Sequence, residues 1–465
     1  MSRIRISRRS LLASGGGVLV APLAGCADFL RGPVYDSSAA ADAASRAAAP
    51  IDPPALADTP AALPPLFDDI ERRTFDFFWA TANPVNGMVP DRHPSPSPAS
   101  IAAVGFALTA YVIGADRGYI TRAQARERTL ATVRFLRAAP QGPQARGATG
   151  HKGFFYHFLD MKSGTRAPDS ELSTVDTALL VGGLLHAQAF FDGAQADEIE
   201  IRALVDAIYW RIDWRWAQAR GQLISLSWSP EKGFSPYDWG GYNEAMLVVL
   251  LALGSPTHPV DASAWSAWSE SYRGTWGRFM GYEHLSFAPL FGHQYSHVWI
   301  DFRGIQDDNI RAHGIDYFEN SRRASLAQHA YGVAKYGDDL WGLTACDGPH
   351  DYAARGATAG DIRDDGTIAP TAAISSMPFT PELSQAAMQS MIEKYGDKLY
   401  KTYGFVDSFN PAQNWFDKDY LGIDQGPIIC MIENHRSGLV WKTMRKNPHI
   451  VRGLKRAGFT GGWLQ

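Results

Sequence analysis

The sequence predicts an all-α fold, an (α/α)6 toroid with short β-hairpins in the inter-helix loops. Two kinds of helical segment support this prediction. Some segments carry apolar side chains on one side only, which is typical of helices with one face in water. Others are apolar or small on every side, which is typical of buried helices. Because the two kinds alternate along at least the first part of the chain, we expect an inner ring of helices covered by an outer one.

The amphipathic segments are the expected outer helices. In residues 66–79, apolar side chains occupy positions 66, 67, 70, 75, 77 and 78, and Thr74 lies on the same side. Residues 122–136 and 198–214 follow the same pattern. Their opposite faces are polar, so each helix is expected to pack one side against the ring.

The inner helices are expected where a buried segment has a polar residue at or next to its start, because Ser, Thr and Asn suit the N-cap. Six such segments begin at Ser100, Thr174, Tyr242, Asn320, Thr380 and Asp424. Pro381 suits the first turn of the fifth helix. Strand-like segments are few, at residues 153–159 and 223–228, and we expect them to be short hairpins beside the helix starts.

The N-terminus has the layout of an export signal. Arg8 and Arg9 precede a short apolar run at residues 11–23, and the run ends in Leu-Ala-Gly-Cys26. This order predicts a twin-arginine lipoprotein signal in residues 1–26, with lipid attached to Cys26. The alternative is an ordinary N-terminal helix with a chance cysteine. Residue 27 is Ala rather than Asp, which favours a periplasmic protein anchored in the outer membrane over inner-membrane retention.

The rest of the chain divides into a linker and one large domain. Residues 27–64 are rich in Ala, Pro, Asp and Ser, and we expect a flexible tether there. No second break in composition follows, so residues 65–465 are predicted to be one catalytic domain. No later stretch reaches the roughly 18 uncharged apolar residues of a membrane-spanning helix, so membrane contact is expected only through the N-terminal lipid.

Composition narrows the classes of partner. The net charge is −4 and no basic stripe is present, so nucleic acid is not an expected partner. The 14 Trp and 18 Tyr residues slightly favour carbohydrate, although large cores also contain many aromatic residues. Beyond Cys26 only Cys346 and Cys430 occur, and residues 361–366 miss the spacing of a calcium loop. No metal and no cofactor is predicted, and we expect a monomer.

Five acidic residues are the candidate catalytic groups, because all lie at or before the start of an inner helix. They are Glu171, Asp176, Glu244, Asp407 and Asp424. Cleavage of a glycosidic bond needs one acid that protonates the leaving oxygen and a second carboxylate that activates water or attacks the sugar. The alternative is that these acids only cap helices. Glu244 is the preferred catalytic residue because nine apolar residues follow it, surroundings that a solvated cap does not need.

Polar and aromatic residues in the loops are candidate sugar contacts. They are Arg92, His93, Trp228, Tyr237, Trp239, Tyr242, His293, Asp301 and Arg303, with Glu171 as a further substrate-binding residue. The alternative for each is packing within its loop.

Four motifs in fixed order resemble a known family. They are Ser-Glu-Leu-Ser-Thr-Val-Asp-Thr-Ala-Leu-Leu at residues 170–180, Gly-Gly-Tyr-Asn-Glu-Ala-Met at 240–246, Gly-Ile-Asp-Gln-Gly-Pro at 422–427 and Met-Ile-Glu-Asn-His-Arg at 431–436. This pattern resembles bacterial glucoamylase-like proteins and, among them, the endo-β-1,2-glucanases of glycoside hydrolase family 144. The resemblance spans roughly residues 66–455.

The resemblance implies an (α/α)6 barrel that hydrolyses a β-1,2-glucan with inversion. It implies Glu244 as the general acid, and Asp407, Asp424 and Asp176 remain candidates for the base. In such enzymes a substrate hydroxyl next to the scissile oxygen can relay the proton.

Two other function classes fit parts of the sequence. A polysaccharide lyase could use Tyr242, Asn243, His293 and Arg303, but the acids at the helix starts would repel a polyanionic substrate. A glucan-binding lipoprotein without hydrolysis would bind intact glucan and leave its length unchanged.

Overall fold

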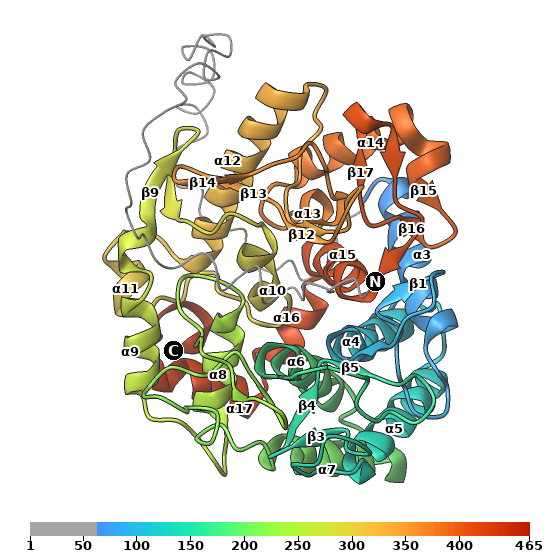
Figure 1. Cartoon of the computed structure of the whole chain (residues 1–465), viewed down its shortest axis with the longest axis vertical. Helices are drawn as coiled ribbons and strands as arrows, with labels where there is room; N and C mark the ends of the chain where they lie inside the picture. The colour runs from blue at the N-terminus through green and yellow to red at the C-terminus, as the bar shows by residue number, and fades with distance from the viewer. Residues whose placement is uncertain (1–62) are drawn as a thin grey trace.

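The structure is a computed structural model that describes residues 63–465. The predicted signal at 1–26, the lipid site at Cys26 and all but the end of the 27–64 linker lie outside the described residues. Helices dominate the described chain, and short strands connect them (Figure 1). Among residues 63–465, no helix has the length and apolar character needed to cross a membrane.

Within residues 63–465, six buried helices form an inner ring. They are α4 (Ile101–Asp116), α6 (Thr174–Phe190), α8 (Ala245–Gly254), α10 (Phe291–Trp299), α13 (Pro370–Ile374) and α15 (Gly422–Arg436). The helices α8, α10 and α13 are buried along their whole length, and the other three are exposed only near their C-terminal ends. Helix α4 packs against α6 and α15, and α10 packs against α8 and α15, so the ring closes around the centre of the molecule (Figure 1).

A second set of helices surrounds the ring. The outer helices are α3 (Pro65–Thr81), α5 (Arg122–Ala138), α7 (Ala196–Trp210), α9 (Ser263–Glu270), α12 (Tyr317–Tyr336) and α14 (Pro381–Leu399). Three of them, α3, α5 and α7, confirm the outer helices predicted from their one-sided apolar pattern. Near the C-terminus, α16 (Leu439–Met444) packs against α6, and α17 (Pro448–Arg456) packs against α8, while α11 (Asp308–Arg311) is a single turn. The predicted (α/α)6 toroid is confirmed.

Two of the six predicted inner helices are wrong. The segment assigned from Thr380 belongs to α14, which exposes one side, and the segment assigned from Asn320 lies inside α12, which is half-buried at residues 322–323 and 329–331 and exposed at 333–335. The inner helices at these places in the ring are α10 and α13. Helix α10 contains His, Gln and Ser, so its sequence looked like a polar loop, but these side chains bond to neighbouring inner helices. Gln294 Nε2, for example, donates to the Ala372 carbonyl at 2.7 Å.

Serine caps fix the starts of two inner helices, as predicted. The Ser100 hydroxyl accepts a hydrogen bond from the Ala103 amide at 3.4 Å, and the Ser173 hydroxyl accepts one from the Asp176 amide at 3.0 Å. Such bonds satisfy amide groups that the first turn leaves without a partner. Pro381 occupies the first turn of α14, as its sequence predicts.

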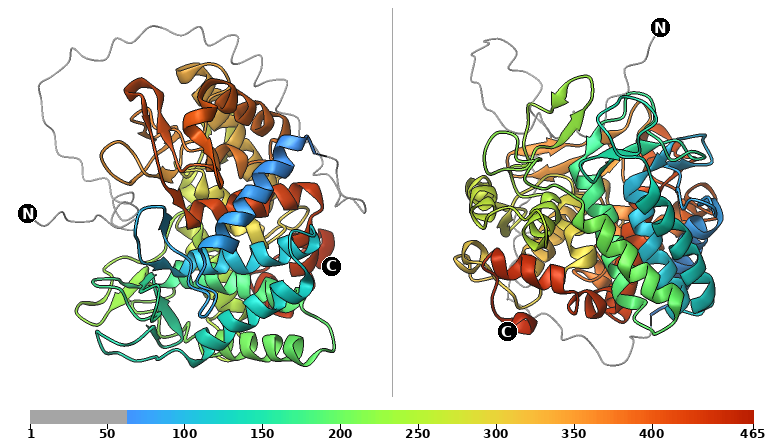
Figure 2. Two further views of the ribbon diagram at one scale, coloured as in Figure 1. Left: turned by 90° about the vertical axis from the view of Figure 1, so that its right-hand side faces the viewer. Right: turned by 90° about the horizontal axis from the view of Figure 1, so that it is seen from below.

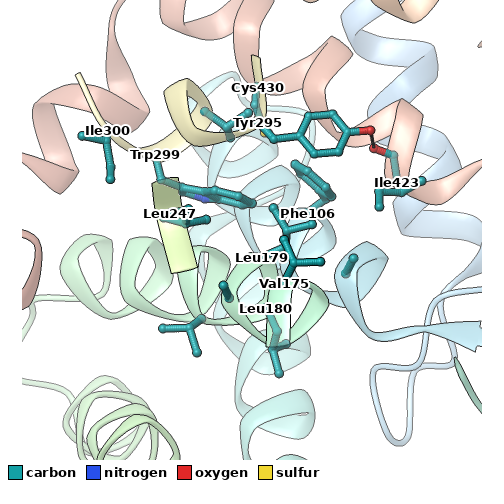
Figure 3. Packing of buried hydrophobic residues seen from close by; sticks show 14 of the residues in the cluster. Phe106, Val175, Leu179, Leu180, Leu247, Tyr295, Trp299, Ile300, Ile423 and Cys430 are labelled. Carbon is teal, nitrogen blue, oxygen red and sulfur yellow. Dashed lines mark hydrogen bonds between the residues drawn. The ribbon is translucent and has the colours of Figure 1, made fainter. Parts of the chain in front are cut away.

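The inner helices approach one another very closely. A Cβ atom built on Gly183 of α6 would lie 1.9 Å from the Gly105 carbonyl oxygen of α4. Beyond this contact, the ring of Phe106 stacks on Trp299 with centroids 5.0 Å apart. Figure 3 shows these two side chains at the centre of the core, with Leu179 of α6 beneath them. Glycine at the crossing therefore sets the spacing of α4 and α6.

The strands are more extensive than the predicted hairpins. A five-stranded antiparallel sheet has the order β3 (Gly150–His151), β4 (Phe154–Tyr156), β6 (Leu172–Ser173), β7 (Ser227–Ser229) and β8 (Gly233–Phe234). Two further pairs join β1 (Arg92–His93) to β19 (Tyr420–Leu421) and β2 (Ala99–Ser100) to β5 (Phe158–Leu159). Because β2, β6 and β19 run directly into α4, α6 and α15, this strand layer covers one end of the ring.

The other described strands form two-stranded antiparallel pairs in the loops. These pairs are β9 (Trp276–Phe279) with β10 (Tyr282–Leu285), β11 (Ala345–Cys346) with β12 (Ala353–Ala354), β13 (Gly356–Thr358) with β14 (Asp361–Arg363), β15 (Tyr400–Lys401) with β16 (Gly404–Phe405), and β17 (Phe409–Asn410) with β18 (Trp415–Phe416). In the right panel of Figure 2, the blue and green helices stand side by side, with their connecting loops and strands gathered at one end.

Candidate active site

Backbone hydrogen bonds bring the starts of three inner helices together. The Ile101 amide of α4 donates to the His157 carbonyl at 3.1 Å, and the Thr174 amide of α6 donates to the Leu226 carbonyl at 3.4 Å. The Gly422 amide of α15 donates to the Asp91 carbonyl, in the loop before α4, at 2.8 Å. We call this end of the toroid the helix-start end.

Side-chain hydrogen bonds tie the other inner helices to the same end. Ser296 of α10 donates to the Glu244 carbonyl at the start of α8, with an Oγ–O distance of 3.3 Å. The Tyr295 hydroxyl of α10 donates to Asp424 Oδ1 of α15 at 3.1 Å, and Thr371 of α13 donates to the Asp424 carbonyl at 2.8 Å. The Tyr295 hydroxyl also lies 3.4 Å from the Ile423 carbonyl, and Figure 3 draws this bond.

Glu244 is buried at the start of α8 and does not serve as its cap. Its residue exposure is 3 %, and within the described chain its side chain makes no capping hydrogen bond. The neighbouring Asn243 takes that role, because its Oδ1 accepts the Ala245 amide at 3.0 Å. The capping explanation considered for this glutamate therefore fails. A buried carboxylate that is not used as a cap is a strong candidate for chemistry.

Asp176 and Glu171 meet through a histidine. Asp176 lies in the first turn of α6 and accepts a short hydrogen bond from the Ser173 hydroxyl. His157 Nδ1 lies 3.0 Å from Glu171 Oε1, and His157 Nε2 lies 3.7 Å from Asp176 Oδ1. The imidazole thus fixes the relative position of two carboxylates at the helix-start end.

Asp407 and Asp424 form a second acidic group, at the start of α15. Both are buried, with exposures of 2 % and 1 %. Burial raises the pKa of Asp407 well above its ordinary value, and the charges of Asp424, Asp347 and Asp417 raise it further, although the Asp347 amide donates to Asp407 Oδ2 at 2.7 Å. Burial and the neighbouring acids thus disfavour the ionised form of Asp407.

Arg92 is a cation next to this acidic group and interacts with Asp347, Asp91 and Asp407. Its Nη1 bonds to Asp347 Oδ2 at 2.5 Å. Burial raises the pKa of Asp347 despite this cation, and burial together with the nearby Asp347 raises the pKa of Asp417 to about 7. One guanidinium thus faces several carboxylates. His93, the next residue, is half-buried with its ring against Tyr403.

Three predicted sugar contacts, Trp239, Tyr242 and His293, are as buried as Glu244 and Asp424 and contact other buried side chains. Trp239 Nε1 donates to the Thr174 hydroxyl at 2.9 Å, so it fastens the loop before α8 to α6. Tyr242 packs parallel to Tyr317, and burial raises its pKa to about 12. His293 is also sealed in, and burial holds its pKa well below the ordinary value, so the ring is neutral. These residues shape the walls through packing.

Trp228 and Tyr237 are more accessible. Trp228 is half-buried in β7, where its ring lies 5.0 Å from that of His151, and Tyr237 is 51 % exposed. Both lie in or beside the strand layer at the helix-start end.

Asp301 and Arg303 are not brought to the helix-start end. They follow the C-terminal end of α10, where Asp301 accepts hydrogen bonds from Arg303 and from Arg445. The Arg303 guanidinium also lies 4.3 Å from the ring centroid of Trp441. This buried ion pair joins α10 to the C-terminal helices, which is a structural role.

The structure adds residues that the sequence did not single out. His157 lies within a segment read only as a strand, and Tyr295 lies within a stretch read as a loop. Asp347, Asp417 and Asp419 were also missed. The available signal was Asp417-Lys-Asp419, two acids just before the last inner helix, the position that had already singled out Asp407.

Comparisons with known proteins agree with this architecture. The family described as "Putative glucoamylase" matches residues 236–448. A Bacteroides uniformis protein described in the same words is 34 % identical to this chain and superposes on it with a TM-score of 0.80. The match covers 87 % of this chain and 100 % of the Bacteroides chain. An endo-β-1,2-glucanase from Chitinophaga pinensis, solved with sophorotriose and glucose, is 31 % identical over 86 % of this chain and 100 % of its own, with a TM-score of 0.77.

The chain belongs to the glucoamylase-like family. The family predicted from the four motifs is thereby confirmed. A relative of known name, the exo β-1,2-glucooligosaccharide sophorohydrolase of Parabacteroides distasonis, is 29 % identical over 430 residues. That match covers 84 % of this chain, which spans only 57 % of the length of the sophorohydrolase.

Proposed function

We propose that this protein is a glycoside hydrolase that cleaves β-1,2-linked glucan, with Glu244 as its general acid. The observation that carries the proposal is the buried Glu244 carboxylate at the helix-start end, beside a cap that Asn243 already supplies. The substrate is inferred from two relatives, whose names state that they act on β-1,2-glucan or its oligosaccharides.

The chemistry requires a second carboxylate, and Asp424 is the best supported base. Inversion needs an ionised carboxylate that takes a proton from water while the acid protonates the leaving oxygen. Asp407 is less suited as the base, because burial and neighbouring acids raise its pKa and so disfavour its ionised form. Asp424 receives the Tyr295 hydroxyl on one oxygen, which orients the carboxylate. Asp176, bound to Ser173 and next to His157, is better suited to hold a sugar hydroxyl.

The principal test replaces the acid and a matched control. Glu244→Gln is expected to lower reducing-sugar release from linear β-1,2-glucan at least about a hundredfold, the usual effect of removing general acid help. Glu382→Gln is the control, because Glu382 also lies in a first helical turn but on an exposed face of α14. Activity of Glu244→Gln above about a tenth of wild type, in a variant with an unchanged circular dichroism spectrum, would refute the assignment.

A leaving-group series separates the acid from the other carboxylates. A glucoside with an activated aryl leaving group needs little protonation, so Glu244→Gln is expected to retain far more activity on it than on glucan. Asp424→Asn is expected to lose activity equally on both substrates and to lose the acidic limb of the pH–rate profile. If Asp176→Asn rather than Asp424→Asn behaves in this way, the base is Asp176.

The products discriminate between the classes of function. Proton NMR of the first product is expected to show the α-anomer, since inversion of a β-linkage gives α. Absorbance from an unsaturated sugar would indicate a lyase, but Tyr242 and His293 are core residues and Arg303 lies past the far end of α10. Bound glucan of unchanged length would indicate a binding protein.

We also propose that the protein is exported and lipid-anchored, in the periplasm, through Cys26. The proposal is supported by Arg8-Arg9, the short apolar run and the Leu-Ala-Gly-Cys order. Cys26→Ser is expected to move the protein from the membrane fraction to the soluble periplasmic fraction, and the double variant Arg8→Lys, Arg9→Lys is expected to block export. An unchanged membrane fraction for Cys26→Ser would contradict lipid attachment at this residue.

A further inference from the structure

Three carboxylates converge beside the start of α15. One oxygen from each of Asp347, Asp417 and Asp419 lies within 4.8 Å of the other two. Oxygens that bind one calcium ion lie about 2.3–2.6 Å from it, so two of them on opposite sides are separated by about 4.6–5.2 Å. The three oxygens are therefore close enough to share one ion without rearrangement of the backbone.

Hydrogen bonds already hold one oxygen of each carboxylate. Arg92 bonds to Asp347 Oδ2, the amides of Lys418 and Asp419 donate to Asp417 Oδ1 at 2.7 and 3.2 Å, and the Ser95 amide donates to Asp419 Oδ1 at 2.8 Å. Among residues 63–465, Asp417 Oδ2 accepts no hydrogen bond, and the Asp347 and Asp417 carboxyl groups lie within hydrogen-bonding reach of each other. The acids are thus fixed by one oxygen and present the other, which is how a preorganised cation site is built.

A second observation points to a positive ligand. Asp417 is 6 % exposed, and its Oδ2 is fully buried without a hydrogen-bond partner among the described residues. Buried carboxylate oxygens are costly unless a proton or a cation satisfies them. Arg92 balances one charge of the group, and the others remain.

We propose that Asp347, Asp417 and Asp419 bind a calcium ion. The donor set consists of carboxylate oxygens alone, without His or Cys. Such ligands favour hard divalent cations such as Ca²⁺ and Mg²⁺ over zinc. The irregular loops that supply the acids suit the flexible coordination of Ca²⁺ better than the strict octahedron of Mg²⁺. The ion joins the loop after β11, the loop after β18 and, through Asp419 and Ser95, the loop after β1. It fixes the wall beside Asp407 and Asp424, and its binding does not rest on the hydrolase activity.

The test measures binding directly on the whole protein. After treatment with EDTA and removal of the chelator, calorimetric titration with CaCl2 is expected to show one saturable site per chain. Ca²⁺ is expected to raise the melting temperature, and the increase should continue with the logarithm of the Ca²⁺ concentration once that exceeds the Kd, since a ligand that binds only the folded state stabilises it. Asp417→Asn and Asp419→Asn are expected to abolish both signals. Asp361→Asn, at a partly exposed acid on β14 already paired with Arg363, is the matched control and is expected to keep both.

Three results would overturn the proposal. One is the absence of saturable heat up to about 1 mM CaCl2 in the wild-type protein, a measurement that does not depend on whether any variant folds. Another is calcium binding of unchanged strength in both Asp417→Asn and Asp419→Asn. The third is stabilisation by sophorose that both variants lose without any effect of Ca²⁺, which would identify the acids as contacts for sugar hydroxyls. Loss of glucan cleavage with intact calcium binding would count against the proposed function alone.

Discussion

The contact between Gly105 and Gly183 allows the stability of an alanine variant in the inner ring to be predicted. Alanine at position 183 would place a methyl carbon 1.9 Å from the Gly105 carbonyl oxygen, far inside the 3.0 Å that Cβ atoms tolerate. The atom that the methyl group would meet is backbone in the middle of a buried helix, so relief requires α4 and α6 to separate by more than 1 Å. Inserting a methyl group into a tightly packed core costs about 1–3 kcal/mol, and sometimes more.

Helix propensity works in the opposite direction at the same site. Replacing a helical glycine with alanine gains about 0.5–1 kcal/mol. The net expectation for Gly183→Ala is a loss of about 1–2 kcal/mol. Gly396→Ala in α14 isolates the favourable part, because the nearest atom to its added Cβ is 3.7 Å away and its backbone is helical. This variant is expected to be about 0.5–1 kcal/mol more stable than wild type.

The assay is urea unfolding of the three proteins, followed by tryptophan fluorescence and circular dichroism. The two alanine variants are expected to move the unfolding midpoint in opposite directions. Gly183→Ala is also expected to slow glucan cleavage, since displacement of α6 moves Asp176, while Gly396→Ala keeps full activity. A Gly183→Ala variant as stable as wild type would show that α4 and α6 are loosely packed at this crossing and would refute the reasoning.

Three further substitutions test other parts of the structure. Burial lowers the pKa of His186 to about 3, and neither ring nitrogen bonds to a described residue. Protonation of this histidine in the unfolded chain is therefore expected to remove up to about 5 kcal/mol of stability as the pH falls from about 6.5 to 3. The melting temperature of His186→Leu should fall less steeply over this pH range than that of wild type. Arg436→Met is expected to lower the free energy of unfolding by about 3–5 kcal/mol in urea titrations, because the buried Glu71 loses the cation 2.5 Å from its carboxylate. Tyr295→Phe removes the hydroxyl that orients Asp424 and is expected to reduce kcat about tenfold with KM nearly unchanged, a loss equal to one hydrogen bond of about 1.4 kcal/mol.

The parts of the fold that follow local physical rules were predictable. The one-sided apolar stripe of α3 and the wholly apolar run after Glu244 each specify burial directly. Helix α10 was not predictable in this way, because its Gln and Ser side chains are buried only through bonds to other inner helices, such as Gln294 to Ala372. Such partners are distant in sequence. The same is true of the five-stranded sheet, whose strands are two or three residues long.

The site was predictable where it depends on helix starts and not where it depends on long-range pairing. Asp176 and Asp424 could be named as candidates because each lies in the first turn of a buried helix, and their catalytic roles stay predictions. His157 and Tyr295, which orient these acids, come from other elements, and nothing in their local sequence predicts the contact. Asp301 was assigned to the wrong end of the ring, because a polar segment can lie before the start or after the end of an inner helix. Only the bounds of the helix decide which of the two it is.

The acidic character of the helix-start end bears on the substrate beyond the two catalytic groups. Asp176, Glu244, Asp424 and the three acids near Arg92 approach the same end of the ring, whereas Arg92 brings one positive charge to them. A negative potential of this kind raises the free energy of a bound uronate or sulfated chain at every residue that enters. A neutral glucan meets no such repulsion, and its hydroxyls can donate hydrogen bonds to carboxylate oxygens. The same excess of acceptors that favours a neutral polyol as the substrate also favours a cation in the wall, so the two proposals share one electrostatic cause while resting on different residues.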